Sequence, residues 1–156
     1  MAVAVSQATE ARGVTRPERK LAWLLRIYAL LCIAGAAVFV LRPDEVVGNI
    51  DRLGRLVRLP TLVPTAYPVA SDFWLAMAVA NMMTLATCAL VAAGDIRRRR
   101  ALVYPIIVSN VVAAAIGILL FVRWSMALPF LAIAIVDLPI AAIFLAALRA
   151  APADRT

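Results

Sequence analysis

The sequence predicts an all-α membrane protein: a four-transmembrane-helix bundle with a short amphipathic interfacial helix between the first and second spans. Hydrophobic residues make up 65% of the 156 residues and the mean hydropathy is +0.94, whereas about 45–50% of the residues in a soluble domain are apolar. Each of four apolar blocks has about 21–23 residues, as a hydrocarbon core about 30 Å thick requires at about 1.5 Å per residue. These blocks are residues 21–41, 73–93, 101–122 and 126–148.

Polar segments flank this transmembrane domain, which covers residues 21–149. Residues 1–20 are predicted to form a mostly disordered cytoplasmic tail, and residues 150–156 are predicted to form a second cytoplasmic tail. A cleaved signal peptide is the alternative for the first block, but its apolar stretch would have only about 7–15 residues before a small-residue cleavage site. The block is longer and runs into the charged residues at 42–45 (RPDE), which favours a retained span.

An amphipathic segment, residues 44–59, follows the first block. It is too short and too charged to cross a bilayer, and charged residues occupy the faces that its apolar residues leave open. A helix lying on the membrane surface is therefore predicted. Its apolar residues recur at helical spacing, at Val46, Ile50, Leu53 and Val57.

Proline and charge mark the connections between the spans. Pro60, Pro64 and Pro68 break any helix before the second span, and Ser71 is the predicted N-cap of that span. Residues 95–100 (DIRRRR) predict a tight charged turn, and residues 123–125 predict a short turn before the fourth span.

The distribution of positive charge predicts the orientation. An even number of spans leaves both termini on the same side as residues 97–100, and that side carries 11 of the 16 Lys and Arg when Arg26 is included. Because cytoplasmic loops are rich in Lys and Arg, both termini are predicted to be cytoplasmic. Aromatic residues near the span ends fit an interfacial belt, namely Trp23, Trp74, Trp124, Tyr28 and Tyr104.

Asp137 lies near the middle of the fourth block. A carboxyl group at that depth costs about 2.5–3.5 kcal/mol on insertion scales, so it should face protein rather than lipid. Either it clamps a neighbouring helix by a hydrogen bond, or it forms part of a ligand or proton site. Pro139 leaves the carbonyl of Ile135 without its usual helical donor, so the helix can kink there.

Two asparagines lie at a depth similar to that of Asp137. Asn81 is in the second block, with Thr84 and Cys88 on the same helical stripe, and Asn110 is in the third block, beside Ser109. These side chains form either a polar core network or the lining of a ligand or proton site.

Small residues flank the same positions. Residues 110, 113, 114 and 117 form one stripe (Asn, Ala, Ala, Gly), and residues 134, 137 and 141 (Ala, Asp, Ala) form another. Stripes of small residues allow helices to approach closely in lipid. Each of these two faces is therefore predicted to pack closely against another helix.

Several classes of chemistry have no support in the sequence. The chain has no histidine and only two cysteines, Cys32 and Cys88, with no CxxC, which argues against histidine-ligated metals and paired-thiol redox chemistry. It contains no phosphate-binding glycine loop, HExxH or nucleophile elbow. No catalytic residue, cofactor or metal is predicted, and the two cysteines are interpreted as small core residues.

The net charge of +7 would suggest nucleic-acid binding in a soluble protein. Here the cations lie at the ends of apolar blocks, and no soluble domain presents a basic face. The arginines of the charged turn are predicted to set the topology and to contact lipid head groups. They are Arg97, Arg98, Arg99 and Arg100.

Four short spans with an amphipathic stretch after the first resemble small bacterial membrane proteins of the DoxX-like kind. More narrowly, Asp95 with its arginines, residues 105–110 (PIIVSN) and residues 136–139 (VDLP) look like uncharacterised bacterial four-helix membrane proteins of similar length, a likeness that covers about residues 70–148. The resemblance implies a bundle in the bacterial inner membrane, sometimes associated with redox partners, and carries over no catalytic residue.

The leading functional hypothesis is a non-enzymatic bundle that packs with itself or a membrane-protein partner, or holds a lipid or other apolar ligand. A proton-linked transporter or channel component that uses Asp137 is the second hypothesis. A membrane enzyme acting on a lipid-soluble substrate is the third. Membrane lipids are the expected partners in all three, and nucleic acid in none.

Overall fold

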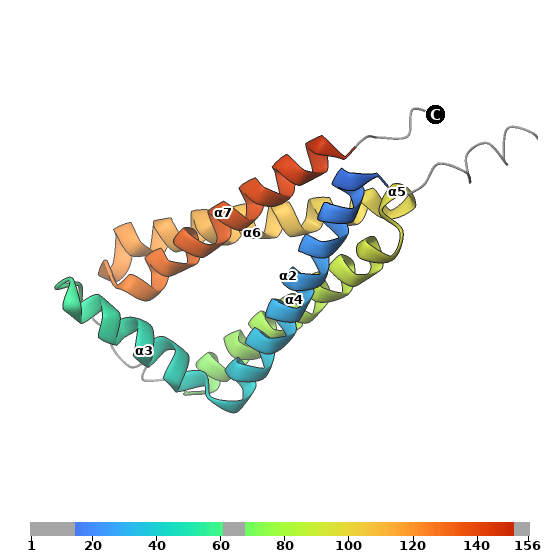
Figure 1. The fold of residues 1–156 in the computed structure, drawn as a ribbon. Helices are drawn as coiled ribbons and strands as arrows, with labels where there is room; N and C mark the ends of the chain where they lie inside the picture. Colours follow the sequence, from blue (N-terminus) through green and yellow to red (C-terminus); the bar gives the residue numbers. More distant parts are fainter. Residues whose placement is uncertain (1–14, 61–67, 152–156) are drawn as a thin grey trace, which may run out of the picture.

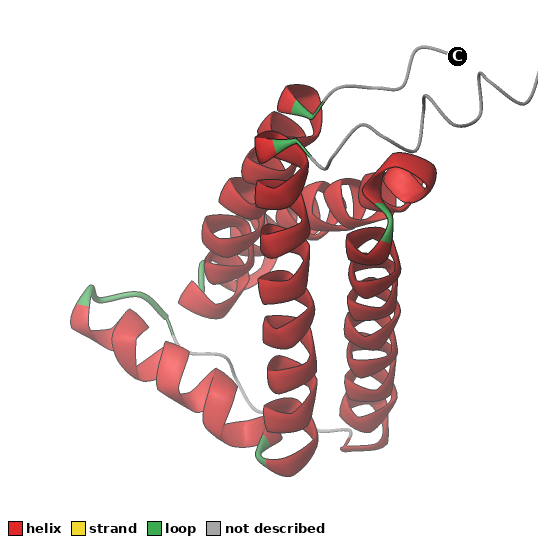
Figure 2. Cartoon of the chain, turned by 45° about the vertical axis from the view of Figure 1, so that its right-hand side comes forward, coloured by secondary structure: helices red, strands yellow, loops and turns green. Residues whose placement is uncertain are grey.

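The computed structural model describes residues 15–60 and 68–151, and within them the chain is helical throughout apart from short connections (Figure 2). Four helical segments are long and apolar enough to cross a membrane. The predicted fold class, an all-α bundle of four spans with an interfacial helix, is therefore confirmed. The four main helices are α2 (Arg16–Leu41), α4 (Pro68–Gly94), α6 (Val103–Leu120) and α7 (Leu128–Ala150), and α3 (Pro43–Leu56) is the interfacial helix (Figure 1).

The spans form two antiparallel pairs, α2 with α4 and α6 with α7 (Figure 1). The pairs meet at the end where α5 (Ile96–Arg99) lies, and they diverge toward the opposite end. Helix α3 bridges the diverging ends by running from the end of α2 to the start of α7. A Cβ atom added at Gly54 would lie 3.0 Å from the Leu128 Cβ, so α3 and α7 pack closely there.

The buried faces of α2 and α4 pack in one hydrophobic core, which also includes Val103 and Ile106 of α6 and Phe144 and Leu148 of α7. On α2 the buried residues recur every three or four positions, as one face of a helix requires. On α4 the stripe is mainly alanine, which lets the two backbones approach closely in lipid. The buried residues are Leu21, Leu25, Tyr28, Ala29, Cys32 and Ala36 on α2 and Leu85, Ala86, Ala89, Ala92 and Ala93 on α4.

The α6–α7 pair uses the small-residue stripes that the sequence predicts. Ala114, Ala134 and Ala141 are buried. A Cβ atom added at Gly117 would lie 2.6 Å from the backbone oxygen of Phe130 and 3.1 Å from the Ile133 Cβ. Only glycine therefore fits this crossing. The two small-residue faces do pack closely, and the structure shows that their partners are each other.

Large apolar side chains stay exposed along all four spans. Examples are Leu30 (66% exposed), Trp74 (67%) and Val122 (63%). In water this much exposed apolar surface would drive association, whereas in a bilayer the acyl chains solvate it. Length, composition and exposure together support a multi-pass membrane protein.

Helix α2 begins at Arg16 rather than at residue 21, because a capping box precedes it. The Glu18 backbone N–H donates to the Thr15 hydroxyl at 3.5 Å, and the Glu18 carboxylate accepts from the Thr15 N–H at 2.6 Å. Residues 16–20, predicted as part of a disordered tail, are therefore helical. The rest of that predicted tail lies outside the described residues, as do residues 152–156 of the second tail.

Two predicted connections are also helical. Helix α4 begins at Pro68, where the first turn tolerates the missing N–H of proline, so Ser71 lies inside the helix and is not its N-cap. Asp95 caps α5 by accepting from the Arg98 N–H at 3.2 Å, and a 3₁₀ turn, Arg100–Leu102, leads into α6. The predicted charged turn is thus a single helical turn.

The remaining boundaries differ by a few residues. Helix α3 ends at Leu56, not at residue 59, because Arg58 adopts a left-handed conformation with φ 59°. A π-helical segment, Phe121–Ser125, extends the third span, and Met126 at φ 49° ends it. Helix α7 then runs from Leu128 through Ala150, two residues beyond the predicted end of the span.

Candidate intramembrane pocket

A pocket of about 380 Å³ lies where the two helical pairs meet, and each of the four spans contributes three of its lining residues. Half of the lining is apolar, and the other half can donate or accept hydrogen bonds. The lining residues are Tyr28, Leu31 and Cys32 from α2, Asn81, Met82 and Leu85 from α4, Ser109, Asn110 and Ala113 from α6, and Val136, Asp137 and Ile140 from α7.

Asn110, one of the lining residues, links the two pairs through α6 and α2. It is only 5% exposed, and its side-chain amide donates to the Tyr28 hydroxyl at 3.1 Å and to the Ile106 backbone oxygen at 2.7 Å. The Tyr28 ring packs edge-on against Phe144, with ring centroids 5.2 Å apart and an interplanar angle of 80°. One hydrogen bond and one ring contact thus hold α2, α6 and α7 together.

Asn81 and Ser109 form a second polar link, between α4 and α6. The Asn81 side-chain amide donates to the Ser109 hydroxyl at 3.4 Å. This distance is long for a hydrogen bond, and Asn81 is exposed while Ser109 is half-buried. Both side chains therefore keep hydrogen-bonding capacity that a molecule in the pocket can use.

Asp137 faces the same pocket from α7 and is half-buried. Across residues 15–60 and 68–151, no hydrogen-bond or ion-pair partner of its carboxyl group is found. Tyr28 and Cys32 line the pocket from α2. An inward-facing acid with open space beside it differs from the bonded helix clamp that the sequence allows as one interpretation.

The structure thus brings Asp137, Asn81, Asn110 and Ser109 together. Thr84 is not among the lining residues: it is exposed, and its hydroxyl donates to the Ala80 backbone oxygen of its own helix at 2.9 Å. Such back-bonding satisfies a hydroxyl in lipid without a second helix.

Sequence reasoning missed two lining residues on α2. Tyr28 was interpreted as an interfacial aromatic and Cys32 as a small core residue, yet both line the pocket. Their spacing of four residues puts them on one helical face. That spacing was the only signal in the sequence, and it does not show which helix the face meets.

The charged turn is tied into the fold at both of its ends. Arg97 donates from Nε to one Glu18 oxygen at 2.7 Å and from Nη2 to the other at 3.1 Å. Arg100 donates from Nη1 to the backbone oxygen of Ala151 at 2.7 Å and from Nη2 to that of Leu148. These two arginines therefore bind helix ends within the protein.

The two middle arginines of the charged turn are more exposed than Arg97 and Arg100. Arg98 and Arg99 are exposed; Arg98 lies 3.9 Å from the Asp95 carboxylate, and Arg99 donates to the Val91 backbone oxygen at 3.4 Å. Contact of this turn with lipid head groups stays a prediction, and it now concerns Arg98 and Arg99 most directly.

Among the residues that the structure describes, no three His, Cys, Asp or Glu side chains gather closely enough to hold a metal ion. Comparisons with protein-family models, with curated proteins and with solved structures found no match to this chain. The DoxX-like resemblance therefore stays a prediction, and function has to be inferred from the geometry of the pocket.

Proposed function

We propose that this chain is a non-enzymatic membrane protein whose four spans hold a small apolar ligand with one hydrogen-bonding group. The convergence of Asp137, Asn81, Asn110 and Ser109 on one pocket supports this proposal most strongly. The volume of about 380 Å³ falls within the range of about 300–1,000 Å³ that is typical of small-molecule sites.

Each part of the lining has a role in this proposal. The Asp137 carboxyl group and the Asn81 amide bind the polar group of the ligand, because both side chains have hydrogen-bonding capacity that faces the pocket. Leu31, Met82 and Ile140 contact its apolar part. Asn110 has a structural role, since Tyr28 and a backbone carbonyl already occupy its amide.

The test uses a photoactivatable probe of this chemistry, a ten-carbon alcohol that carries a diazirine on its chain. It is added to the purified chain in lipid nanodiscs, crosslinked by light and mapped by mass spectrometry. Adducts should concentrate on the more buried pocket residues Met82, Leu85 and Ile140. An even spread over lipid-facing residues such as Leu30 and Leu119 would disprove a specific pocket.

A matched pair of variants sharpens this test. Ala113→Phe fills the pocket, whereas Ala115→Phe adds the same ring to an exposed position on the same helix. Pocket adducts should fall strongly in the first variant and persist in the second. Equal labelling of both variants would contradict the proposal.

A proton-linked transporter is the second candidate, because Asp137 lines the pocket without a partner among the described residues. In proteoliposomes containing a pH-sensitive dye, this function predicts proton flux in the parent chain and none in Asp137→Asn, with both chains equally well assembled. Absence of flux in the parent would rule out this second candidate.

The proposed location is the bacterial inner membrane, with both termini in the cytoplasm. The support is the bias of Lys and Arg, 11 of 16, toward the side with the two termini and the charged turn. Membrane lipids are the proposed partners, together with a second copy of the chain or another membrane protein.

A further inference from the structure

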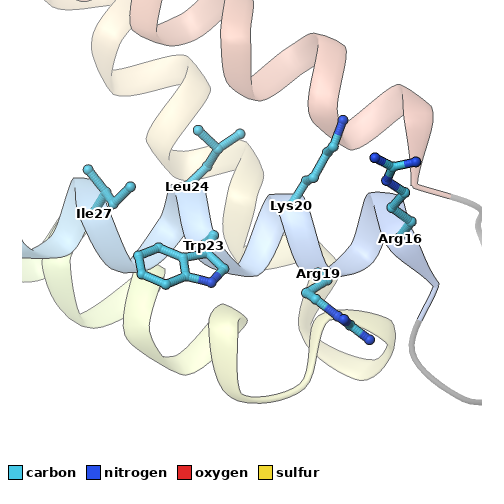
Figure 3. Close-up of a pocket in the computed structure, with 6 residues that line it drawn as sticks. All are labelled: Arg16, Arg19, Lys20, Trp23, Leu24 and Ile27. Atoms are coloured by element: carbon cyan, nitrogen blue, oxygen red, sulfur yellow. The ribbon is translucent and has the colours of Figure 1, made fainter.

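The first turns of α2 carry a groove of about 460 Å³ on their outer face, separate from the four-span pocket. Its lining residues repeat at spacings of three and four, so they form one stripe of the helix. Figure 3 shows cations around the first turns and apolar side chains along the next ones. The lining residues are Arg16, Arg19, Lys20, Trp23, Leu24 and Ile27.

The positive charge of this groove is not neutralised by the one acidic residue of α2. Glu18 is only 3% exposed, and both of its carboxylate oxygens accept hydrogen bonds from Arg97. Within residues 15–60 and 68–151, no carboxylate forms an ion pair with Arg16, Arg19 or Lys20. The fold thus directs the acid inward and leaves three exposed cations on the outer surface.

The apolar part of the groove begins one turn further along α2. Trp23 is 61% exposed and Ile27 is 46% exposed, with Leu24 half-buried between them. Tryptophan is typical of the level at which head groups meet acyl chains. A cationic end that continues directly into an apolar end matches a phosphodiester joined to an acyl chain.

The charged turn does not offer the same combination of exposed cations and an adjoining apolar groove. Arg97 and Arg100 are engaged within the protein, and the exposed Arg98 and Arg99 are not part of this groove. The α2 groove is therefore the better site for a whole lipid, whereas Arg98 and Arg99 can contribute only general attraction to an anionic surface.

We propose that this α2 groove binds an anionic phospholipid. The lipid phosphate lies among Arg16, Arg19 and Lys20, and one acyl chain runs along Trp23, Leu24 and Ile27. A zwitterionic lipid binds more weakly, because its own ammonium group offsets the attraction of the three cations. The site is independent of the four-span pocket and of whatever that pocket holds.

The test measures quenching of Trp23 fluorescence by brominated lipids. In the full chain with Trp74→Phe and Trp124→Phe, Trp23 is the remaining tryptophan. The protein is reconstituted into vesicles of phosphatidylglycerol and phosphatidylcholine, with bromine on the acyl chains of one lipid or the other. Quenching requires a brominated acyl chain near Trp23, so free phosphate cannot imitate the result. Bulk lipid contributes equally with either label at equal mole fraction, so a difference between the two lipids reports preferential binding. Brominated phosphatidylglycerol should quench more strongly at equal mole fraction.

Two double variants remove the same amount of charge. Arg19→Gln/Lys20→Gln should lower the preference for phosphatidylglycerol at Trp23 by about fivefold for each cation removed. Arg98→Gln/Arg99→Gln, which changes the exposed turn, should keep most of the preference. All four residues are exposed, so neither change should unfold the chain, and helicity measured by circular dichroism checks this.

Equal quenching by the two lipids in the parent chain would overturn the proposal. Equal loss of preference in the two double variants would also overturn it, because attraction would then come from total charge and not from the groove. A preference lost only when Arg19 and Lys20 are replaced supports the groove as the lipid site.

Discussion

The Glu18 carboxylate and the Arg97 guanidinium form a two-pronged ion pair, with distances of 2.7 Å from Nε and 3.1 Å from Nη2 to the two oxygens. The two residues are 79 positions apart. The pair ties the start of α2 to α5, and Glu18 also belongs to the capping box of α2. One side chain thus sets the start of α2 and ties it to the connection between α4 and α6.

Replacing either partner of this ion pair should destabilise the fold, and replacing both should cost less than the sum of the two single changes. A double-mutant cycle with Glu18→Ala and Arg97→Ala should give a coupling free energy of about 1–3 kcal/mol, because Glu18 is buried and both hydrogen bonds are charge-assisted. Unfolding in mixed micelles of increasing SDS content, followed by circular dichroism, measures it. Additive effects of the two changes would mean that the pair contributes nothing specific.

Gly117→Ala should destabilise the chain by about 1–3 kcal/mol, because its methyl group would collide with the backbone of α7, which cannot move aside cheaply. Gly48→Ala is the matched control, since nothing lies within 4 Å of its added Cβ. That change should stabilise α3 by about 0.5–1 kcal/mol through helix propensity. Thermal unfolding in detergent compares the two. A neutral Gly117→Ala would refute the close crossing of α6 and α7.

Tyr28→Phe should cost about 0.5–1.5 kcal/mol, because it removes the hydroxyl that accepts from the Asn110 amide while keeping the ring against Phe144. Tyr104→Phe is the control at an exposed position, 55% exposed, and should change stability little. The same unfolding measurement applies to both variants. If they are equally stable, the hydrogen bond between α2 and α6 has no energetic role.

The proposed topology predicts which positions react with a membrane-impermeant thiol reagent. In a chain with Cys32→Ala and Cys88→Ala, single cysteines replace Ser6, Arg98 or Asn49. In intact cells the reagent should label position 49, and it should label positions 6 and 98 only after the cells are opened, because of the charge bias. Labelling of positions 6 and 98 on opposite sides would be incompatible with four spans.

The spans could be predicted because their signal is local and large. A run of about 21–23 apolar residues is long enough to cross a bilayer, and the free energy of burying it in lipid exceeds any local preference. The starts of helices were less well predicted, because one or two hydrogen bonds decide them. Helix α2 starts at Arg16, before the predicted residue 21, because Thr15 and Glu18 form a capping box. Helix α4 starts at Pro68, before the predicted residue 73, because proline is tolerated in the first turn of a helix.

The pocket could be predicted only in part. The depths of Asp137, Asn81 and Asn110 along their spans indicated that they could meet, and the structure brings them to one pocket. Thr84 shares a stripe with Asn81, yet it satisfies its hydroxyl within its own helix and stays outside the pocket. Depth is a property of sequence position, whereas the direction of a side chain depends on which neighbours its helix meets.

The sequence by itself determined that this chain is a helical membrane protein with four spans, because the length and apolarity of each span are local properties. The tertiary structure alone decided that the spans form two diverging pairs with a pocket between them, and that Glu18 turns inward while Arg16, Arg19 and Lys20 stay outside. The physical reason is that pairing depends on which small-residue faces fit together, and no local pattern specifies the partner of a face.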